Sequence, residues 1–215
     1  MHEIVTLNMD NPAVQYLCEK DKRLAKVISM VGEVTYKPYA DGYSFLVHEI
    51  IEQMLSVKAG ARIYDRLLVL CNGCITPECI TALSDEAIKS TGTSNAKVKY
   101  IKCLTSAITN KQIDLSQLPA LSDSEVMRQL TNLRGIGSWT AKMYLIFVLD
   151  RPNVLPYEDA AFLQGFKWAY KVDILSKEKI KQKCKKWNPY SSIAARYMYR
   201  ALDMGLTKNE FHLYK

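Results

Sequence analysis

Apolar residues recur with helical spacing along almost the whole chain of 215 residues. In the segment 42–56 they stand at Phe45, Leu46, Ile50, Ile51 and Met54, which places them on one side of a helix. The same spacing predicts helices at 21–31, 58–70, 96–108, 124–133, 138–150, 177–187 and 191–203. Strand-like alternation is scarce, apart from a doubtful stretch at 33–40. The sequence therefore predicts an all-α fold of about ten helical elements.

Composition and length favour one well-packed body, built as two lobes. Apolar residues make up 48% of the chain and charged residues 24%, which is ordinary for a globular protein and excludes a disordered one. The sequence has no apolar run of 18 residues, and its first residues lack the basic and apolar regions of a signal peptide. We therefore expect a cytoplasmic or nucleoid-associated protein with no membrane partner.

The net charge of +7 is unevenly distributed along the chain. Residues 167–215 contain 12 Lys and Arg against 4 Asp and Glu, whereas residues 1–166 contain 17 and 18. A run of like charge can be a solvated helix face, and it can equally be the binding surface for a polyanion. Nucleic acid is the first polyanion to consider for a basic surface of this kind.

Three of the six cysteines lie close together in the sequence, at Cys71, Cys74 and Cys79. A Cys-x2-Cys pair can begin a zinc site, but a closed site needs four ligands. The sequence offers no second pair of this type and no His-x3-His pair, so we expect no metal. Without a secretory signal, reduced thiols are the default.

Two glycines flank an isoleucine in the segment LRGIGSWTAKMYL at 133–145. Helices are predicted on both sides, so Gly135, Ile136 and Gly137 form the turn of a helix-hairpin-helix unit. Glycines allow unusual backbone angles and leave the amides accessible, and amides at a helix N-terminus can bind a phosphate. We expect Ile136 to point inward. A structural helix cap explains such a turn equally well.

Asp159 follows Gly137 by 22 residues, after a helix and the loop RPNVLP. This combination resembles the helix-hairpin-helix (HhH-GPD) DNA glycosylase superfamily, and it is most similar to the 3-methyladenine DNA glycosylase branch, which acts in repair of alkylated DNA. Further segments support the resemblance, which covers about residues 20–205: EQMLSVKAGARIYDRL, TPECITALSDEAIKSTGTSNAKVKYIK, GIGSWTAKMYLIF and KKWNPYSSIAARYMYRAL.

The resemblance implies that Asp159 is the catalytic carboxylate. Hydrolysis of an N-glycosidic bond builds positive charge on the deoxyribose, and a nearby carboxylate stabilises that charge. It can also orient or deprotonate the attacking water. Glu158 and Asp150 lie close in the sequence, and only the family pattern selects Asp159 over them. Asp159 is also a candidate N-cap of the following helix, and the two roles are compatible.

An alkylated purine carries positive charge and departs without a protein acid, so an aromatic pocket suffices to select it. Trp139, Tyr144 and Trp168 are candidates for its walls, although core packing is the commoner role for Tyr144 and Trp168. Trp139 stands where strand-nicking members of the superfamily carry a lysine nucleophile. Because indole cannot form a Schiff base, the resemblance implies a monofunctional enzyme that leaves an intact abasic strand. We do not expect Lys142 to act as the nucleophile in place of that lysine, since it faces a different direction on the helix.

The resemblance also implies a set of DNA contacts and a side chain that fills the gap left by the flipped base. Met54 is our choice for this wedge, with Leu55 as the alternative; core packing at a helix end is a further reading of both. The family usually places an arginine at Ser191, a contact that Lys185, Lys186 and Arg196 are expected to replace. The DNA-binding candidates are Gly135, Ile136, Gly137, Thr140, Gln53, Met54, Leu55, Ser56, Lys185 and Lys186.

The family architecture implies two helical lobes, one at 42–152 containing the hairpin and one made of 1–41 with 153–215, and a cleft for DNA. We expect a reduced form of the branch, without the extra N-terminal β domain of its longer members. The implied partner is double-stranded DNA with a damaged base, bound by a monomer that uses no cofactor. Two alternatives remain: a glycosylase for an oxidised or deaminated base, and a non-catalytic DNA-binding protein.

Overall fold

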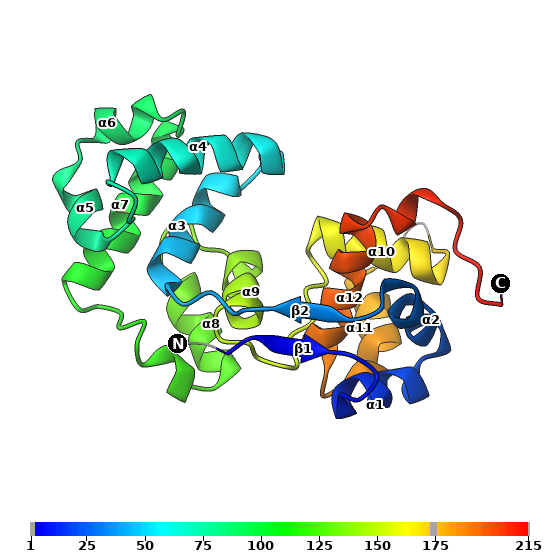
Figure 1. The fold of residues 1–215 in the computed structure, drawn as a ribbon. Coiled ribbons are helices and arrows are strands. Elements are labelled where there is room, and N and C mark those ends of the chain that lie inside the picture. Colours follow the sequence, from blue (N-terminus) through cyan, green and yellow to red (C-terminus); the bar gives the residue numbers. More distant parts are fainter. Residues whose placement is uncertain (1–2, 173–175, 215) are drawn as a thin grey trace. The chain divides into compact units, whose positions relative to one another are not determined.

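A computed structural model describes residues 3–172 and 176–214 (Figure 1). The chain divides into two compact units. The middle unit is Tyr39–Leu149, and the terminal unit combines Met1–Pro38 with Asp150–Lys215. The boundaries lie three residues before the predicted ones, at 38/39 and 149/150. Within the described residues, every helix is too short or too polar to cross a lipid bilayer.

The middle unit consists of helices, whose bounds are α3 (Gly42–Glu52), α4 (Val57–Leu70), α5 (Pro77–Ala82), α6 (Asp85–Ser90), α7 (Asn95–Thr109), α8 (Asp123–Thr131) and α9 (Ser138–Phe147), with a 3-10 turn at Leu118–Ala120. Helix α3 packs on α4, α7 and α9, and α8 packs on α9. Hydroxyl side chains begin several of these helices by accepting a hydrogen bond from a backbone N–H in the first turn, which replaces a missing helical partner. These caps are Ser56, Thr76, Ser84, Ser94 and Ser122.

Helix α3 is shorter than its apolar pattern predicts. It ends at Glu52, whereas the spacing of apolar residues predicted a helix to residue 56. Residues Gln53 to Leu55 form a turn, and Met54 adopts a positive φ of 59°. Met54 is fully exposed and Leu55 is 41% exposed, so packing of these two side chains in the core is wrong. The apolar pattern does not distinguish an exposed apolar residue after a helix end from a core residue.

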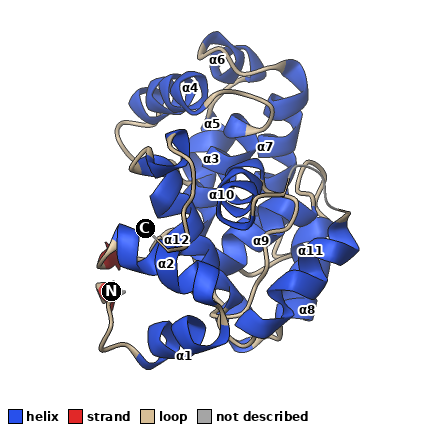
Figure 2. Cartoon of the chain, turned by 90° about the vertical axis from the view of Figure 1, so that its right-hand side faces the viewer, coloured by secondary structure: helices blue, strands red, loops and turns tan. Residues whose placement is uncertain are grey.

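The terminal unit adds a small sheet to its helices. Strands β1 (Val5–Leu7) and β2 (Val34–Tyr36) pair antiparallel, with Thr6 opposite Thr35. Figure 2 shows how little of the described chain is strand, so the predicted all-α class holds apart from this two-stranded ribbon. The helices of this unit are α1 (Pro12–Lys20), α2 (Lys22–Val31), α10 (Ala160–Tyr170), α11 (Lys177–Cys184) and α12 (Ser191–Asp203), with 3-10 turns at Lys185–Trp187 and Leu206–Lys208.

Aromatic side chains and one buried carboxylate organise the core of the terminal unit. Trp187 is fully buried and contacts Phe162 and Phe166 edge-on. Its indole N–H donates to Asp21 Oδ2 at 2.9 Å, and the Tyr170 hydroxyl donates to the same oxygen. Burial alone would raise the pKa of Asp21, but these hydrogen bonds and the nearby Lys186 ammonium lower it below its ordinary value. Asp21 also caps α2, so one residue joins three parts of the unit.

Candidate functional site

The two glycines of the hairpin turn between α8 and α9 differ in what their positions require. Gly135 has a φ of +92°, which L side chains rarely adopt, and a Cβ added there would lie 2.2 Å from Cγ of Tyr100. Gly137 has an extended backbone with a φ of −95°, and a Cβ there would meet nothing within 4 Å. The first glycine allows the chain to turn against Tyr100. The second keeps the approach to the first turn of α9 open.

Two side chains support the turn from inside the middle unit. Ile136 is 4% exposed, as expected for an inward plug. Gln53 donates from Nε2 to the carbonyl of Gly135 at 2.9 Å and lies 3.4 Å from Oγ1 of Thr140. Thr140 is only 1% exposed, so its side chain faces the turn and is not available to DNA in this structure. Gly137 caps α9 without a side-chain hydrogen bond, unlike the hydroxyl-capped helices before it.

The turn of residues 53–55, called the wedge loop below, projects Met54 from the middle unit. A positive φ is uncommon for a residue with a side chain and costs conformational energy. Ser56 ends the loop by capping α4 through a hydrogen bond from the Ala59 N–H at 3.3 Å. Of the two candidate wedges, Met54 presents its whole side chain and Leu55 less than half. The exposure favours Met54, and the wedge role stays a prediction.

The three aromatic candidates differ in their surroundings. Tyr144 is 2% exposed, its hydroxyl lies close to Gly42, and its ring meets Phe45 edge-on. Trp168 donates from Nε1 to the carbonyl of Asn209 at 2.8 Å and packs on Phe211. These are the contacts of packing residues, the role that was the commoner expectation for both. Trp139, in the first turn of α9, is half-buried. Trp168 is half-buried as well, so burial does not single out Trp139, whose role as a base contact stays a prediction.

Asp159 lies at the N-terminus of α10 and is 8% exposed. Its Oδ1 accepts a hydrogen bond from the Phe162 N–H at 2.7 Å, so the capping role is present. The hydrogen bond fixes the direction of the carboxylate, and the helix N-terminus places positive partial charge beside it. Asp150, one of its rivals in the sequence, has a different role. Its Oδ1 accepts hydrogen bonds from Arg196 at 2.9 Å and from the Tyr36 hydroxyl at 3.0 Å.

The basic residues near Ser191 are only partly available to a ligand. Lys186 forms an ion pair with the buried Asp21 at 3.0 Å. Arg196 is 8% exposed, pairs with Asp150 and stacks on the ring of Tyr36. The expectation that both replace the missing family arginine is therefore weakened, because their charges serve contacts inside the terminal unit. Lys185 is exposed.

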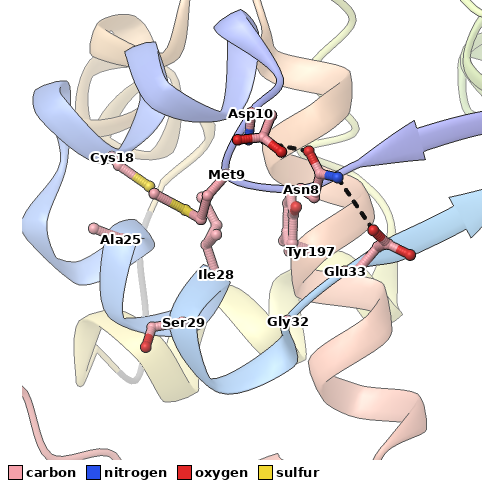
Figure 3. A pocket seen from close by; sticks show the side chains of 10 residues that line it. All are labelled: Asn8, Met9, Asp10, Cys18, Ala25, Ile28, Ser29, Gly32, Glu33 and Tyr197. Atoms are coloured by element: carbon pink, nitrogen blue, oxygen red, sulfur yellow. Dashed lines mark hydrogen bonds between the residues drawn. The ribbon is translucent and has the colours of Figure 1, made fainter.

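Ser191 donates from Oγ to Oδ1 of Asn153 at 2.9 Å and borders a shallow pocket of about 480 Å³. Lys181 and Lys185 also line this pocket. A larger cavity of about 650 Å³ lies elsewhere in the terminal unit (Figure 3). Its rim is polar, with Asn8 donating to Glu33 at 3.1 Å, and Cys18 and Met9 contribute sulfur atoms to its wall. None of the predicted site residues lines it.

Cysteine, histidine and acidic side chains are the residues of this chain that could bind a metal ion. Cys71 is buried, and burial together with a hydrogen bond involving Cys79 raises the pKa of its thiol to about 12. Within the described residues, three or more His, Cys, Asp or Glu side chains bring their ligand atoms within 4.8 Å of one another at one place, formed by His48, Glu49 and Glu52. His48 pairs with both acids, at 3.2 and 3.6 Å.

Sequence reasoning missed two residues of α7 that lie under the wedge loop and the hairpin turn. Lys97 donates to the carbonyls of Ile51 and Gln53 at 2.7 and 2.6 Å, and Tyr100 packs against Gly135. Their spacing of three residues places them on one side of a helix. That spacing does not reveal which distant backbone they touch, so no sequence signal identified them.

Comparison with known proteins gives a consistent result. Residues 47–189 match the model of the HhH-GPD superfamily of base excision DNA repair proteins. The structure of a DNA-3-methyladenine glycosidase from Bacillus halodurans is 31% identical, with 97% of each chain covered and a TM-score of 0.84. The 3-methyladenine DNA glycosylase Mag1 of Schizosaccharomyces pombe, solved in complex with abasic DNA, is 25% identical, with 95% of this chain and 100% of that one covered and a TM-score of 0.83. The putative DNA-3-methyladenine glycosylase YfjP of Bacillus subtilis is 31% identical over 128 residues, which are 59% of this chain and 45% of that protein.

Proposed function

Because the chain belongs to the HhH-GPD superfamily of base excision DNA repair proteins, we propose that it is a DNA glycosylase for alkylated purines of the 3-methyladenine and 7-methylguanine type. It hydrolyses the bond between the damaged base and the deoxyribose and leaves an abasic site. The observation that carries the proposal is the carboxylate of Asp159, which is nearly buried and held in one direction at the start of α10. Relatives named for 3-methyladenine support the class of substrate.

The reaction needs little from the protein beyond a fixed negative charge. As the bond from C1′ to the purine nitrogen breaks, its electron pair leaves with the base and positive charge develops on the sugar. The carboxylate of Asp159 stabilises that charge, and its fixed orientation means that no reorganisation is needed at the transition state. A water molecule then adds to C1′ and loses a proton to Asp159 or to solvent.

Selection of the base rests on its charge. An alkylated purine is already positive, and an indole face attracts such a cation more strongly than it attracts a neutral base. Trp139 offers this face in the first turn of α9. An alkylated base also leaves readily once the carboxylate is in place, so the site needs no separate proton donor.

We also propose that the enzyme has no strand-cleaving activity. Strand cleavage in this superfamily requires an amine that attacks C1′ to form a Schiff base. Trp139 occupies that position, and Lys142 on the same helix is only 9% exposed. Treatment with borohydride during reaction on a damaged duplex should therefore give no covalent adduct between protein and DNA. An adduct would overturn this part of the proposal.

Recognition of double-stranded DNA uses backbone contacts and one inserted side chain. The amides at the start of α9, next to Gly137, bind a phosphate, since the positive end of the helix dipole points there. Met54 enters the base stack and fills the gap left by the flipped nucleotide, which otherwise costs a few kcal/mol. These contacts select damaged DNA by shape and deformability. The protein acts as a monomer.

A direct test measures base release from duplexes that carry 7-methylguanine, 3-methyladenine, hypoxanthine or 8-oxoguanine at one position. Alkali cleaves the strand wherever a base has been lost. We expect release of the two methylated purines and no release by Asp159→Asn, which keeps an oxygen to cap α10 and therefore folds. If no duplex loses its base, the enzyme proposal fails and a DNA-binding protein remains. Full activity of Asp159→Asn would show that the catalytic carboxylate lies elsewhere, and release of 8-oxoguanine alone would overturn the substrate class.

A further inference from the structure

Helix α7 carries a lysine whose ammonium is directed at the end of α3. Lys97 Nζ donates to the carbonyl of Ile51 at 2.7 Å and to that of Gln53 at 2.6 Å. These carbonyls belong to the last turn of α3 and the start of the wedge loop, where a helix leaves acceptors without partners. A cation at this end also opposes the negative pole of the helix dipole. Burial lowers the pKa of Lys97, so part of its hydration has been exchanged for these two contacts.

The wedge loop is also held by a hydrogen bond to the hairpin turn. The amide of Gln53 donates to the carbonyl of Gly135 at 2.9 Å. Gly135 in turn lies against Tyr100, which is one helical turn after Lys97 on α7. Lys97 and Tyr100 therefore touch two different segments, and Gln53 joins those segments to each other. The wedge loop, the turn and α7 form a closed set of contacts within the middle unit.

This arrangement explains how Met54 can keep a costly conformation. A residue with a positive φ and a fully exposed side chain gains no packing of its own to offset the strain. Hydrogen bonds of Gln53, the residue before Met54, supply that support: its carbonyl accepts from Lys97, and its side-chain amide donates to Gly135. A loop fixed in this way loses less conformational freedom when it meets DNA.

We propose that Lys97 is a positioning residue for base flipping: it holds the wedge loop in its inserting conformation before DNA binds, and it acts on base flipping through Met54 without itself touching DNA. This inference rests on the wedge role proposed above for Met54. Loss of the ammonium would leave the loop mobile, so the ordering would have to occur during binding. Loss of Lys97 should therefore lower the affinity for damaged DNA, at which Met54 is inserted, and should leave the affinity for an intact duplex unchanged.

The chain contains a matched control on the same helix. Lys102 Nζ donates to the carbonyls of Ile80 and Leu83 at 2.8 and 2.5 Å, at the end of α5. It therefore holds a helix end with two hydrogen bonds, as Lys97 does, but at a place distant in sequence from the wedge loop and the hairpin turn. A Lys102 variant therefore measures how much such a contact contributes to the stability of the fold, apart from any effect on the wedge loop.

The experiment compares Lys97→Met and Lys102→Met in the full chain. Fluorescence anisotropy gives the affinity for a duplex with a tetrahydrofuran abasic-site analogue and for the same duplex without it, and the ratio is the selectivity. Because a hydrogen bond to a charged group is worth about tenfold or more in an equilibrium, Lys97→Met should lower the selectivity about tenfold. Lys102→Met should leave it unchanged while losing a similar amount of thermal stability.

A double-mutant cycle separates positioning from general weakening. If Lys97 acts through Met54, the pair Met54→Ala and Lys97→Met should be no less selective than the more damaging single variant. The corresponding pair with Lys102→Met should show independent effects.

The inference is overturned if Lys97→Met keeps the selectivity of the wild type, if Lys102→Met loses it equally, or if the effects of Lys97→Met and Met54→Ala are additive. If Met54→Ala itself keeps the selectivity, the wedge role fails and the role of Lys97 fails with it. Base release from a 7-methylguanine duplex, measured on the wild type, tests the glycosylase proposal separately. A failure of the glycosylase proposal would therefore be detected in the wild type alone, without either variant.

Discussion

In the middle unit, the residues proposed to contact DNA are set by backbone geometry, namely the positive φ of Gly135, the open Cβ position of Gly137 and the raised Met54. In the terminal unit, the residues proposed to contact DNA are charged side chains. Some basic side chains there already form ion pairs within the protein. Lys186 pairs with Asp21, and Arg196 pairs with Asp150. A count of lysines and arginines in the sequence thus overstates the charge available to a ligand, because a carboxylate of the protein can pair with a basic side chain that looks available.

Gly135→Ala is the sharpest test of the backbone geometry that defines the site in the middle unit. The added methyl group would strain a positive φ and collide with the base of the Tyr100 side chain, which cannot swing away, so we expect a loss of about 3–4 kcal/mol of unfolding free energy. Urea denaturation followed by circular dichroism measures it.

Gly137→Ala is the matched control, since its φ of −95° suits any residue. It should leave stability unchanged or raise it slightly, yet weaken binding to duplex DNA, because the methyl group stands where the phosphate approaches. Normal DNA affinity of Gly137→Ala would remove the phosphate contact from the hairpin.

The buried carboxylate of the terminal unit gives the next largest effect. Asp21→Ala removes the cap of α2 and leaves the buried indole N–H of Trp187 without its acceptor, which should cost about 3 kcal/mol. The low pKa of Asp21 means that this stability is present above the carboxyl's unfolded value, near pH 4, and is lost as the pH falls through the folded value. Unfolding experiments from pH 3 to 7 should show the difference from wild type shrinking at the acid end. A constant difference would mean that the charge of Asp21 contributes nothing.

Neighbouring lysines should respond differently to salt. Lys185 is exposed, whereas Lys186 faces Asp21. If only Lys185 reaches a phosphate, Lys185→Ala should reduce the slope of log K against log salt by about one, and Lys186→Ala should change it less. Anisotropy titrations on an undamaged duplex at several salt concentrations provide the slopes. Equal slopes for both variants would show that Lys186 leaves Asp21 to bind DNA.

The smallest expected effect concerns His48 on α3. A hydrogen bond with Glu49, opposed by burial and assisted by the charges of Glu52 and Glu49, raises the pKa of His48 above its ordinary value. Its stabilising contribution is therefore complete below about pH 6.5, the ordinary value, and is lost as the pH rises through the raised one. We expect His48→Gln to lose about 0.5 kcal/mol at pH 5.5 and almost nothing at pH 9. A thermal melting difference that grows with pH would contradict this.

Particular residues show where sequence reasoning succeeded. Ile136 points inward between its glycines, Asp159 caps the helix that follows it, and the helices at 58–70 and 191–203 begin or end within a residue of their predicted bounds. The cap and the helix bounds depend on contacts between residues three or four apart. The family resemblance added the function, because the hairpin and Asp159 occur together in the right order.

The same reasoning failed where a residue's partner is distant in the sequence. Lys97 reaches carbonyls 44 and 46 residues away, and Trp187 binds Asp21 across 166 residues. The helix predicted at 42–56 ends at Glu52, and Lys97 holds the carbonyls of Ile51 and Gln53 at that end. The short strand β1 carried no detectable alternation, since three residues are too few for a pattern.

The sequence by itself determined the helical class, the hairpin with its two glycines, and the membership that assigns Asp159 and Trp139 their proposed roles. Spacing and caps act over one turn of helix, so they can be read along the chain. Only the tertiary structure decided which charges remain available and what supports the wedge loop. Those depend on which segments meet in the fold, where a carboxylate such as Asp21 can pair with a lysine, and where the ammonium of Lys97 can hold a strained turn.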